Sequence, residues 1–410
     1  MLYFSTKVGK VYGRDELLAK VLKWRDHDLI KVVTGIRRCG KSVLLEMVCD
    51  AIRESGVGSN RIAHINFESR QAAELNTPER VWAELDRQLR GRGKKYVFLD
   101  EVQRVESFEK LVDAIYADKQ YDCYITGSNA WMMSGELATY LSGRYIEIHV
   151  TPFSFAEFAA GQSFDRRDLW LDYCRYGAFP YVRKLLEVGE REGVGQYLEG
   201  VFNTVLLKDV SMRVKMSDAG TVRRIAEYLF DNIGNLTNVK RISNVLSSNG
   251  GKVSYPSVAN YVDLLCSAYL FYRCERMDVK GLEILKTGAK YYAVDTGLRS
   301  YINGNRAGDS GRLLENVVYF ELKRHHRNVF TGATRGGHEI DFVTRDGDEI
   351  TYYQVADSVK DEKTLARELK ALEDVDDNFA KYLIVGDDTN PVMHNGIRQL
   401  SVYDFLRILA

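Results

Sequence analysis

The chain has 410 residues and a mass of 46.8 kDa, and its 57 lysine and arginine residues balance its 57 aspartate and glutamate residues. This length suggests two or three domains. The 45% hydrophobic content excludes a wholly disordered chain. The zero net charge excludes a uniformly basic protein that coats nucleic acid. Any contact with DNA must therefore come from a local patch.

Targeting and cysteine signals point to the cytoplasm. No apolar stretch approaches the length of about 18 residues that a membrane-spanning helix needs, and the first residues lack the apolar core of a signal peptide. The six cysteines are scattered, without the spacing of a zinc site. We expect a cytoplasmic protein without membrane contact, disulfides or structural zinc.

The strongest motif comes early. Residues 29–34 form an apolar, β-branched run that predicts a buried strand, and the loop Gly35–Ser42 (GIRRCGKS) and a predicted helix follow. This is the G-x-x-x-x-G-K-[ST] pattern in its strand–loop–helix context, which predicts a phosphate-binding loop for ATP and Mg²⁺. The residues expected to bind the nucleotide are Gly35, Arg38, Cys39, Gly40, Lys41, Ser42 and Val43.

A second predicted strand, residues 94–99, ends in the adjacent carboxylates Asp100 and Glu101. Beside a phosphate loop, one carboxylate at a strand end completes the Mg²⁺ shell and another polarises the attacking water. We therefore predict that Asp100 and Ser42 bind Mg²⁺, that Glu101 is the catalytic base, and that Lys41 stabilises the charge on the phosphates.

Two further polar signals follow. Ser128 and Asn129 come after the predicted strand 122–126, where a side chain can sense the γ-phosphate, although Gly-Ser-Asn is also an ordinary turn. We predict Asn129, or its neighbour Ser128, as this sensor. Arg144 precedes the predicted strand 145–150, and it is either an arginine finger that acts on a neighbouring subunit's nucleotide or a solvent-exposed arginine.

A series of motifs resembles a large group of prokaryotic AAA+ ATPases of the AAA_14 type. They cover nearly the whole chain: Tyr12-Gly-Arg14, GIRRCGKS, LDEVQ at 99–103, ITGSN at 125–129, LSGRYIEIHVTPFSFAEF at 141–158, RYGAFP at 175–180, KYYAVDTGL at 290–298, LEN at 314–316 and EIDF at 339–342. The resemblance implies an AAA-type domain with the nucleotide-site roles given above. It also implies a C-terminal domain of unknown function that descends from the PD-(D/E)xK nuclease fold.

The middle of the chain reads as helical. We expect residues 156–216 to form a helical lid, and residues 217–300 contain three predicted helices and two strands in a winged-helix pattern. The third helix would present polar and aromatic side chains to DNA: Ser254, Tyr255, Ser257 and Asn260. Because that helix carries no Arg or Lys, attraction for phosphate would come from Lys240, Arg241 and Lys252. The alternative is a winged helix that packs against the ATPase domain or a protein partner.

Residues 301–410 alternate helix and strand in a way that fits the nuclease-like core of the resemblance. The expected elements are a helix at 313–324, strands at 328–331, 339–345 and 352–356, a helix at 361–374 and a strand at 382–385. We expect a mixed sheet with flanking helices.

Metal-dependent cleavage in such a core needs a carboxylate at the end of one strand, and a Glu and a Lys two residues apart on the next. Asp341 fits the first position, and Glu315 could add a carboxylate from the helix. Gln354 and Ala356 stand where the Glu and the Lys are needed. We therefore predict that Glu315, Asp341 and Gln354 form a vestigial, inactive nuclease site.

Two alternatives remain open in this region. A displaced lysine, Lys360 or Lys363, would restore the missing function. The basic run at 323–327 is either a favourable charge at a helix C-terminus or a phosphate contact.

We thus expect an α/β protein in four segments. They are a P-loop AAA+ domain with a parallel sheet (1–155), a helical lid (156–216), a winged-helix-like domain (217–300) and a nuclease-like domain (301–410). The expected function is ATP hydrolysis by a homo-oligomer, such as a hexamer, that acts on duplex or branched DNA. The alternatives are an ATP-driven switch that binds a protein partner and a Mg²⁺-dependent nuclease.

Overall fold

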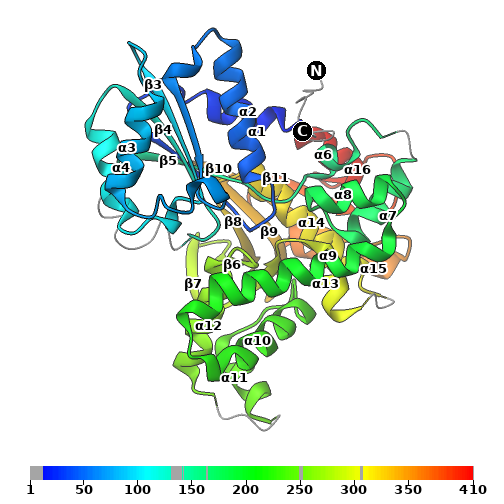
Figure 1. Cartoon of the computed structure of the whole chain (residues 1–410). Helices are drawn as coiled ribbons and strands as arrows, with labels where there is room; N and C mark the ends of the chain where they lie inside the picture. Colours follow the sequence, from blue (N-terminus) through cyan, green and yellow to red (C-terminus); the bar gives the residue numbers. More distant parts are fainter. Residues whose placement is uncertain are drawn as a thin grey trace. The chain divides into compact units, whose positions relative to one another are not determined.

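The structure is a computed structural model that describes residues 13–130, 141, 143–162, 165–248, 253–304 and 308–409 (Figure 1). The predictions for Tyr12 and Lys252 lie outside the described residues. The chain divides into two compact units. Unit 1 comprises Met1–Pro152 with Ser267–Tyr269, and unit 2 comprises Phe153–Cys266 with Leu270–Ala410. Each unit has a β-sheet of its own.

Unit 1 is built on a parallel sheet in the order β2-β3-β4-β1-β5. Its strands are β1 (Ile30–Thr34), β2 (Ile62–Asn66), β3 (Lys95–Asp100), β4 (Tyr121–Gly127) and β5 (Tyr145–His149). The four strands expected from the sequence are confirmed to within about one residue at each end. The remaining strand, β2, was not predicted from the sequence.

Helices cover both faces of this sheet, with α3 and α4 on one side and α1 and α2 on the other (Figure 1). They are α1 (Asp15–Leu22), α2 (Lys41–Glu54), α3 (Pro78–Gln88) and α4 (Phe108–Ala117), with short 3₁₀ turns at Ser59–Arg61, Arg70–Ala72 and Val102–Arg104. Ile30 and Val32 pack with the apolar residues of α3 and α4. Lys31, between them, is fully buried and forms an ion pair with Asp122. Side chains alternate along a strand, so Lys31 points to the opposite face from Ile30 and Val32.

Unit 2 begins with a helical segment, as expected for residues 156–216. It contains α6 (Phe155–Ala159), α7 (Arg166–Tyr176), α8 (Pro180–Glu187), α9 (Arg191–Thr204), a π-helical turn (Val205–Val210) and 3₁₀ turns at Ser211–Arg213 and Met216–Asp218. A capping box starts α6, because Ser154 Oγ accepts a hydrogen bond from Glu157 N and Glu157 Oε2 accepts one from Ser154 N. The role of this segment as a lid stays a prediction.

The three helices expected in the 217–300 segment are present: α10 (Ala219–Asp231), α11 (Val239–Ser248) and α12 (Tyr255–Ser267). The antiparallel strands β6 (Phe271–Asp278) and β7 (Glu283–Ala293) follow, and then α13 (Thr296–Asn303). However, β6 also pairs in parallel with β8 (Val329–Ala333). The strands expected to close a winged helix therefore belong to a larger sheet, and the winged-helix assignment itself stays a prediction.

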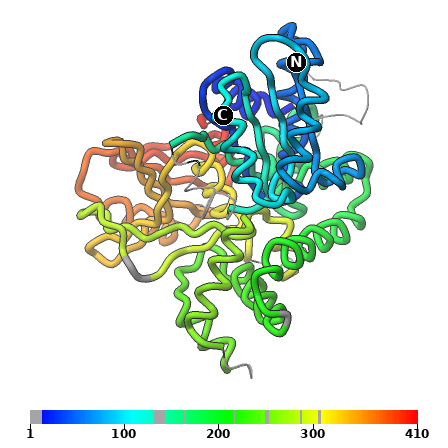
Figure 2. Tube along the Cα trace, turned by 60° about the vertical axis from the view of Figure 1, so that its left-hand side comes forward, coloured from blue at the N-terminus to red at the C-terminus, as the bar shows by residue number. Residues whose placement is uncertain are grey.

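That sheet has the order β12-β13-β11-β10-β9-β8-β6-β7. Its other strands are β9 (Glu339–Asp346), β10 (Glu349–Ala356), β11 (Ala380–Val385), β12 (Val392–His394) and β13 (Ile397–Ser401), with helices α14 (Ser310–His325), α15 (Glu362–Glu373) and α16 (Val402–Leu409). Figure 2 shows the lime hairpin of β6 and β7 beside the yellow-to-orange strands. The expected mixed sheet is confirmed, but it also includes β6 and β7 from the 217–300 segment. The four segment boundaries stay a prediction, and the one at 300/301 separates strands of a single sheet.

Two of the sequence motifs meet inside unit 2, at the start of α13. The Asp295 carboxylate caps this helix by accepting a hydrogen bond from Leu298 N (3.0 Å), and it accepts another from Ala178 N (2.6 Å). Gly297 approaches Tyr176 so closely that a Cβ atom would lie 2.0 Å from the Tyr176 carbonyl oxygen. The RYGAFP and VDTGL motifs therefore have a packing role.

We expect Gly297→Ala to lower the free energy of unfolding by about 1–3 kcal/mol, because the new methyl group must displace the backbone at Tyr176. The matched control is Gly200→Ala in α9, where a Cβ atom meets nothing within 4 Å. That change should be neutral or stabilising by up to about 1 kcal/mol. Urea-unfolding midpoints measure both effects, and equal midpoints would contradict the packing role.

Candidate functional site

The phosphate loop connects the carboxyl end of β1 to α2, as the sequence predicts. Gly35 has a φ of 143°, and a Cβ atom there would lie 2.0 Å from the Val150 carbonyl oxygen. Gly40 is the N-cap of α2 with a φ of 102°, in the left-handed region. Only glycine meets both demands without strain, so the two motif glycines let the loop turn back onto the helix N-terminus.

Lys41 is buried at the base of this loop. Its Nζ donates hydrogen bonds to the carbonyl oxygens of Gly35 (3.0 Å) and Ile36 (3.1 Å) and lies 3.7 Å from Glu101 Oε1. Ser42 follows in the first turn of α2, whose dipole and free amide groups favour an anion. The phosphate loop, the Lys41 ammonium group and the N-terminus of α2 therefore lie together.

The other predicted loop residues differ in their surroundings. Arg38 is exposed and has a φ of 68°. Cys39 is buried, its Sγ donates to the Val150 carbonyl oxygen (3.3 Å), and burial raises the pKa of this thiol. Cys39 therefore holds the loop by packing, whereas the Val43 side chain is exposed.

Asp100 and Glu101 end β3 at the same edge of the sheet. Asp100 is fully buried, and its carboxylate accepts hydrogen bonds from Thr126 Oγ1 (2.5 Å) and Asn66 Nδ2 (3.0 Å). Glu101 has a φ of 57°, and its amide nitrogen donates to Thr126 Oγ1 (2.8 Å). A non-glycine residue in the left-handed region is strained, which is common at functional sites. Asn66 and Thr126 were not predicted as site residues, although both lie at strand ends.

The Glu101 carboxylate has polar neighbours of its own. Gln103 Nε2 donates to Glu101 Oε2 (2.5 Å), and Arg37 Nη1 lies 3.9 Å from the same oxygen. Arg37, which the sequence reasoning also missed, lies 3.5 Å from Glu68 Oε1 as well. These contacts orient the carboxylate towards the loop.

The residues after β4 lie at this edge as predicted. Ser128 and Asn129 are both buried. Within the described part of the chain, Ser128 Oγ has no hydrogen-bond partner. A buried hydroxyl without a partner is costly, which makes Ser128 a suitable group to contact a ligand.

A segment from far along the chain also packs at the end of β1. Thr34 Oγ1 donates to Glu147 Oε1 (2.6 Å) and lies 3.0 Å from His149 Nδ1. The Tyr269 ring packs against the His149 ring, and the two ring centroids lie 4.7 Å apart. Tyr269 belongs to the segment Ser267–Tyr269, which connects α12 to β6 and is part of unit 1.

Arg144 lies at the other end of the sheet. It immediately precedes β5, next to the start of β1, where Ile30 N donates to the Arg144 carbonyl oxygen (2.9 Å). Its guanidinium forms an ion pair with Asp113 Oδ1 (2.7 Å) and is half-exposed. The phosphate loop follows the opposite end of β1, about 16 Å away for a five-residue strand. The structure therefore does not bring Arg144 together with the loop of its own chain.

Oxygen atoms at the loop suit Mg²⁺. Ser42 supplies a hydroxyl and Asp100 a carboxylate that is held by two hydrogen bonds. Among the described residues, no group of three or more His, Cys, Asp or Glu side chains is placed to hold a metal ion. Mg²⁺ usually takes one or two protein ligands together with phosphate oxygens, so these residues fit a nucleotide-bound Mg²⁺.

In unit 2 the three residues of the predicted vestigial nuclease site do come together. Asp341 N donates to Gln354 Oε1 (3.2 Å), and Asp341 and Glu315 both contact Lys290 Nζ. Lys290 was not predicted as a site residue. Its only signal in the sequence is a single cation in the apolar run AKYYAV.

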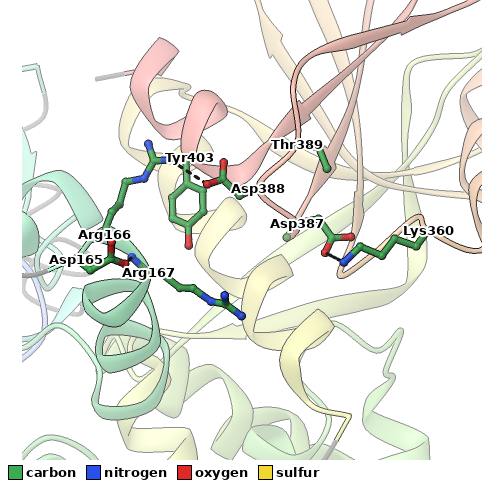
Figure 3. A pocket seen from close by; sticks show the side chains of 9 residues that line it. Asp165, Arg166, Arg167, Lys360, Asp387, Asp388, Thr389 and Tyr403 are labelled. Carbon is green, nitrogen blue, oxygen red and sulfur yellow. Dashed lines mark hydrogen bonds and ion pairs between the residues drawn. The ribbon is translucent and has the colours of Figure 1, made fainter.

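A polar pocket of about 420 Å³ lies at the carboxyl ends of β10 and β11, beside the start of α7 (Figure 3). Lys360, considered above as a displaced nuclease lysine, forms an ion pair there with Asp387 (2.8 Å). Arg166 pairs with Asp388 (3.4 Å) and lies over the Tyr403 ring. These ion pairs leave the pocket lining with little net charge.

The basic run at 323–327 is largely bonded within unit 2. Arg324 is paired with Glu321 (2.8 Å), and His326 Nδ1 lies 2.6 Å from Asp346 Oδ2. Lys323 Nζ donates to the Arg327 carbonyl oxygen (3.1 Å). This favours the interpretation as a helix C-terminus over that as a phosphate contact.

Comparison with known proteins places the chain in a family. The AAA domain family AAA_14 matches residues 27–159, and a domain of unknown function, DUF8612, matches residues 167–309. An uncharacterized protein of Haemophilus influenzae is 36% identical over 400 residues, which cover 96% of this chain and 98% of that protein. The chain belongs to the AAA_14 family. The resemblance to AAA+ ATPases and the α/β fold class are thereby confirmed.

Other proteins show more distant likenesses to this chain. An uncharacterized protein of Methanocaldococcus jannaschii is 26% identical over 384 residues, which cover 90% of this chain and 82% of that protein. The Walker-type ATPase of Pyrococcus abyssi is 15% identical with a TM-score of 0.47, covering 72% of this chain and 96% of its own. Aeropyrum pernix Orc1 in complex with DNA is 13% identical with a TM-score of 0.31, covering 72% and 93%. At these scores the structural likenesses carry no argument about function.

None of the described helices has the length and apolar character needed to cross a membrane.

Proposed function

We propose that this protein binds ATP with Mg²⁺ and hydrolyses it. The observation that carries the proposal is the grouping of Lys41, Asp100 and Glu101 at the carboxyl edge of the parallel sheet. Membership of an AAA domain family supports it.

In the proposed reaction each residue has a distinct task. The loop amides and Lys41 bind the β and γ phosphates, and Ser42 and Asp100 hold Mg²⁺, which withdraws charge from the phosphate oxygens when bound. Glu101 orients and polarises the attacking water, with its carboxylate held by Gln103. The γ-phosphate sensor is Asn129 or its neighbour Ser128, and the hydroxyl of Ser128, which has no hydrogen-bond partner among the described residues, supports the second choice.

We expect Lys41→Ala to abolish ATP binding, and Glu101→Gln to preserve binding while lowering turnover about 10²–10⁴-fold, because the amide cannot accept a proton. Binding of a fluorescent ATP analogue and phosphate release measure the two effects separately. The matched control is Glu106→Gln, an exposed glutamate a few residues after Glu101, and its turnover should stay close to normal. Normal turnover by Glu101→Gln would contradict the assignment of the base.

We also propose that the active form is a homo-oligomer, such as a hexameric ring, in which Arg144 acts on a neighbouring chain's nucleotide. The support is the place of Arg144, half-exposed at the end of the sheet remote from its own phosphate loop. An arginine there can stabilise transition-state charge only in trans.

We expect Arg144→Ala to be inactive alone and to regain part of its turnover when it is mixed with Lys41→Ala, because mixed assemblies contain sites with both residues intact. The control is Asp113→Asn, which breaks the ion pair of Arg144 but keeps the guanidinium. It should hydrolyse ATP normally. If Asp113→Asn loses as much activity as Arg144→Ala, or if mixing restores nothing, Arg144 has only a structural role.

DNA is the partner that we propose for the α10–α12 region. Lys240 and Arg241 are exposed at the start of α11, and Ser254 and Tyr255 are exposed at the start of α12. The supporting charge is small, since α12 itself carries no cation. DNA binding through this region would therefore be weak and sensitive to salt.

We expect the double variant Lys240→Ala, Arg241→Ala to bind duplex DNA more weakly. The slope of log affinity against log salt concentration should become smaller in magnitude by about 2, because each lost phosphate contact removes about one unit. Lys280→Ala, an exposed lysine between β6 and β7, is the control and should change neither quantity. Filter binding across a salt series measures both. Absence of wild-type affinity for duplex or branched DNA at low salt would overturn the proposal and favour the ATP-driven switch that binds a protein partner.

A further inference from the structure

The carboxylates of the vestigial nuclease site surround a buried ammonium group. Lys290 lies on β7, and 2% of its side chain is exposed. Its Nζ lies 2.8 Å from Glu315 Oε1, 2.9 Å from Glu339 Oε1 and 3.1 Å from Asp341 Oδ1. An ammonium group has three donors, and here three carboxylates surround it.

The carboxylate oxygens of Glu315 and Asp341 also have other protein groups close to them, some of which donate hydrogen bonds to them. Glu315 Oε1 also accepts a hydrogen bond from the Tyr292 hydroxyl (2.7 Å), and Asp341 Oδ2 accepts one from Val355 N (3.0 Å). A Cβ atom on Gly234 would lie 2.9 Å from Glu315 Oε2, so backbone closely covers that oxygen. At Glu315 and Asp341, a metal ion would have to compete for oxygens that are already bonded or covered.

The next strand does not supply what a metal centre needs. Gln354 accepts a hydrogen bond from Asp341 N through Oε1 and donates through Nε2 to Glu368 Oε2 (2.8 Å). Both ends of its amide are therefore engaged in protein contacts. Ala356, where a nuclease would have its lysine, is buried and apolar.

The surrounding carboxylates keep Lys290 in its ammonium form. Burial alone would lower the pKa of Lys290, but Glu315, Asp341 and Glu339 outweigh it and raise this pKa well above its usual value. Burial raises the pKa of Glu315 to about 7, against the opposing effect of Lys290. No group of three or more potential ligands among the described residues is placed to hold a metal ion. The residues present therefore do not fit the metal of a nuclease.

We propose that the Lys290 ammonium is the resident cation of this site and takes the place of the divalent metal that a nuclease would bind there. An ammonium brings one positive charge and no Lewis acidity, so it balances the carboxylates without activating water. Lys290 also ties the β6–β7 hairpin to α14 and β9, which carry Glu315 and Asp341. The cluster is then a cross-link within unit 2 and not a catalytic centre.

The first test of the proposal is Mn²⁺ binding by the nucleotide-free full-length protein. The electron paramagnetic resonance signal of the free ion measures how much Mn²⁺ remains unbound. We expect wild type and Asp341→Asn to show the same uptake, because neither holds a metal at this cluster. One Mn²⁺ per wild-type chain that Asp341→Asn loses would overturn the proposal. So would wild-type nicking of a plasmid with Mn²⁺ that Lys290→Met abolishes, because Lys290 would then be a catalytic lysine.

Lys290→Met provides the second test, because it leaves three carboxylates facing one another without a cation. We expect a lower melting temperature that Mn²⁺ partly restores, with an apparent Kd of roughly 10⁻⁴–10⁻³ M, as for weak carboxylate sites. The melting temperature of wild type should not respond. Adding Asp341→Asn to this variant should remove the restoration.

The matched control is Lys31→Met, which removes an equally buried strand lysine that pairs with the single carboxylate of Asp122. It should be destabilised without any restoration by Mn²⁺. A folded Lys290→Met that does not respond to Mn²⁺, or one that responds no more than Lys31→Met, overturns the proposal. If Lys290→Met does not fold, the Mn²⁺ uptake of wild type and Asp341→Asn decides between the two outcomes.

Discussion

Parallel alignment of the strands is the constraint on which the site of unit 1 depends. Because β1, β3 and β4 run in the same direction, the residues that follow each of them meet at one edge of the sheet. That edge receives the phosphate loop, the Asp100–Glu101 pair and Ser128. Near the other end of β1 and β4, the buried Lys31–Asp122 ion pair holds the same two strands together. The Lys31–Asp122 ion pair therefore helps to keep β1 and β4 aligned, and this alignment positions the residues proposed to bind and hydrolyse ATP.

Most of this edge could be predicted from the sequence, because its signals are local. The phosphate loop has a fixed spacing, and each β-branched run marks the strand whose end carries a polar residue. Asn66 and Thr126 could not be assigned in this way. They contact Asp100 because β2 and β4 flank β3, and the order of strands in a sheet is not written in the spacing along the chain.

In unit 2, too, the sequence predicted some of the residues that meet in the fold but not their partners. The expected helix and strands did place Glu315, Asp341 and Gln354 together, yet the cation among them comes from β7, which the sequence assigned to a different segment. The basic run at 323–327 was equally ambiguous, because its partners Glu321 and Asp346 become neighbours only in the fold. A charge pattern shows that a cation is present, but it does not show whether the protein already supplies its counter-ion.

The segment Ser267–Tyr269 makes a second covalent link between the two units. The chain passes from one unit to the other after Pro152, after Cys266 and again after Tyr269. The two units are therefore covalently linked at two separate regions of the chain, at Pro152 and around Ser267–Tyr269. The second crossing is also fastened at the end of β1, where Tyr269 packs on His149. A short stretch of chain between α12 and β6 thus belongs to the unit that carries the phosphate loop, although β6 and nearly all of α12 belong to unit 2.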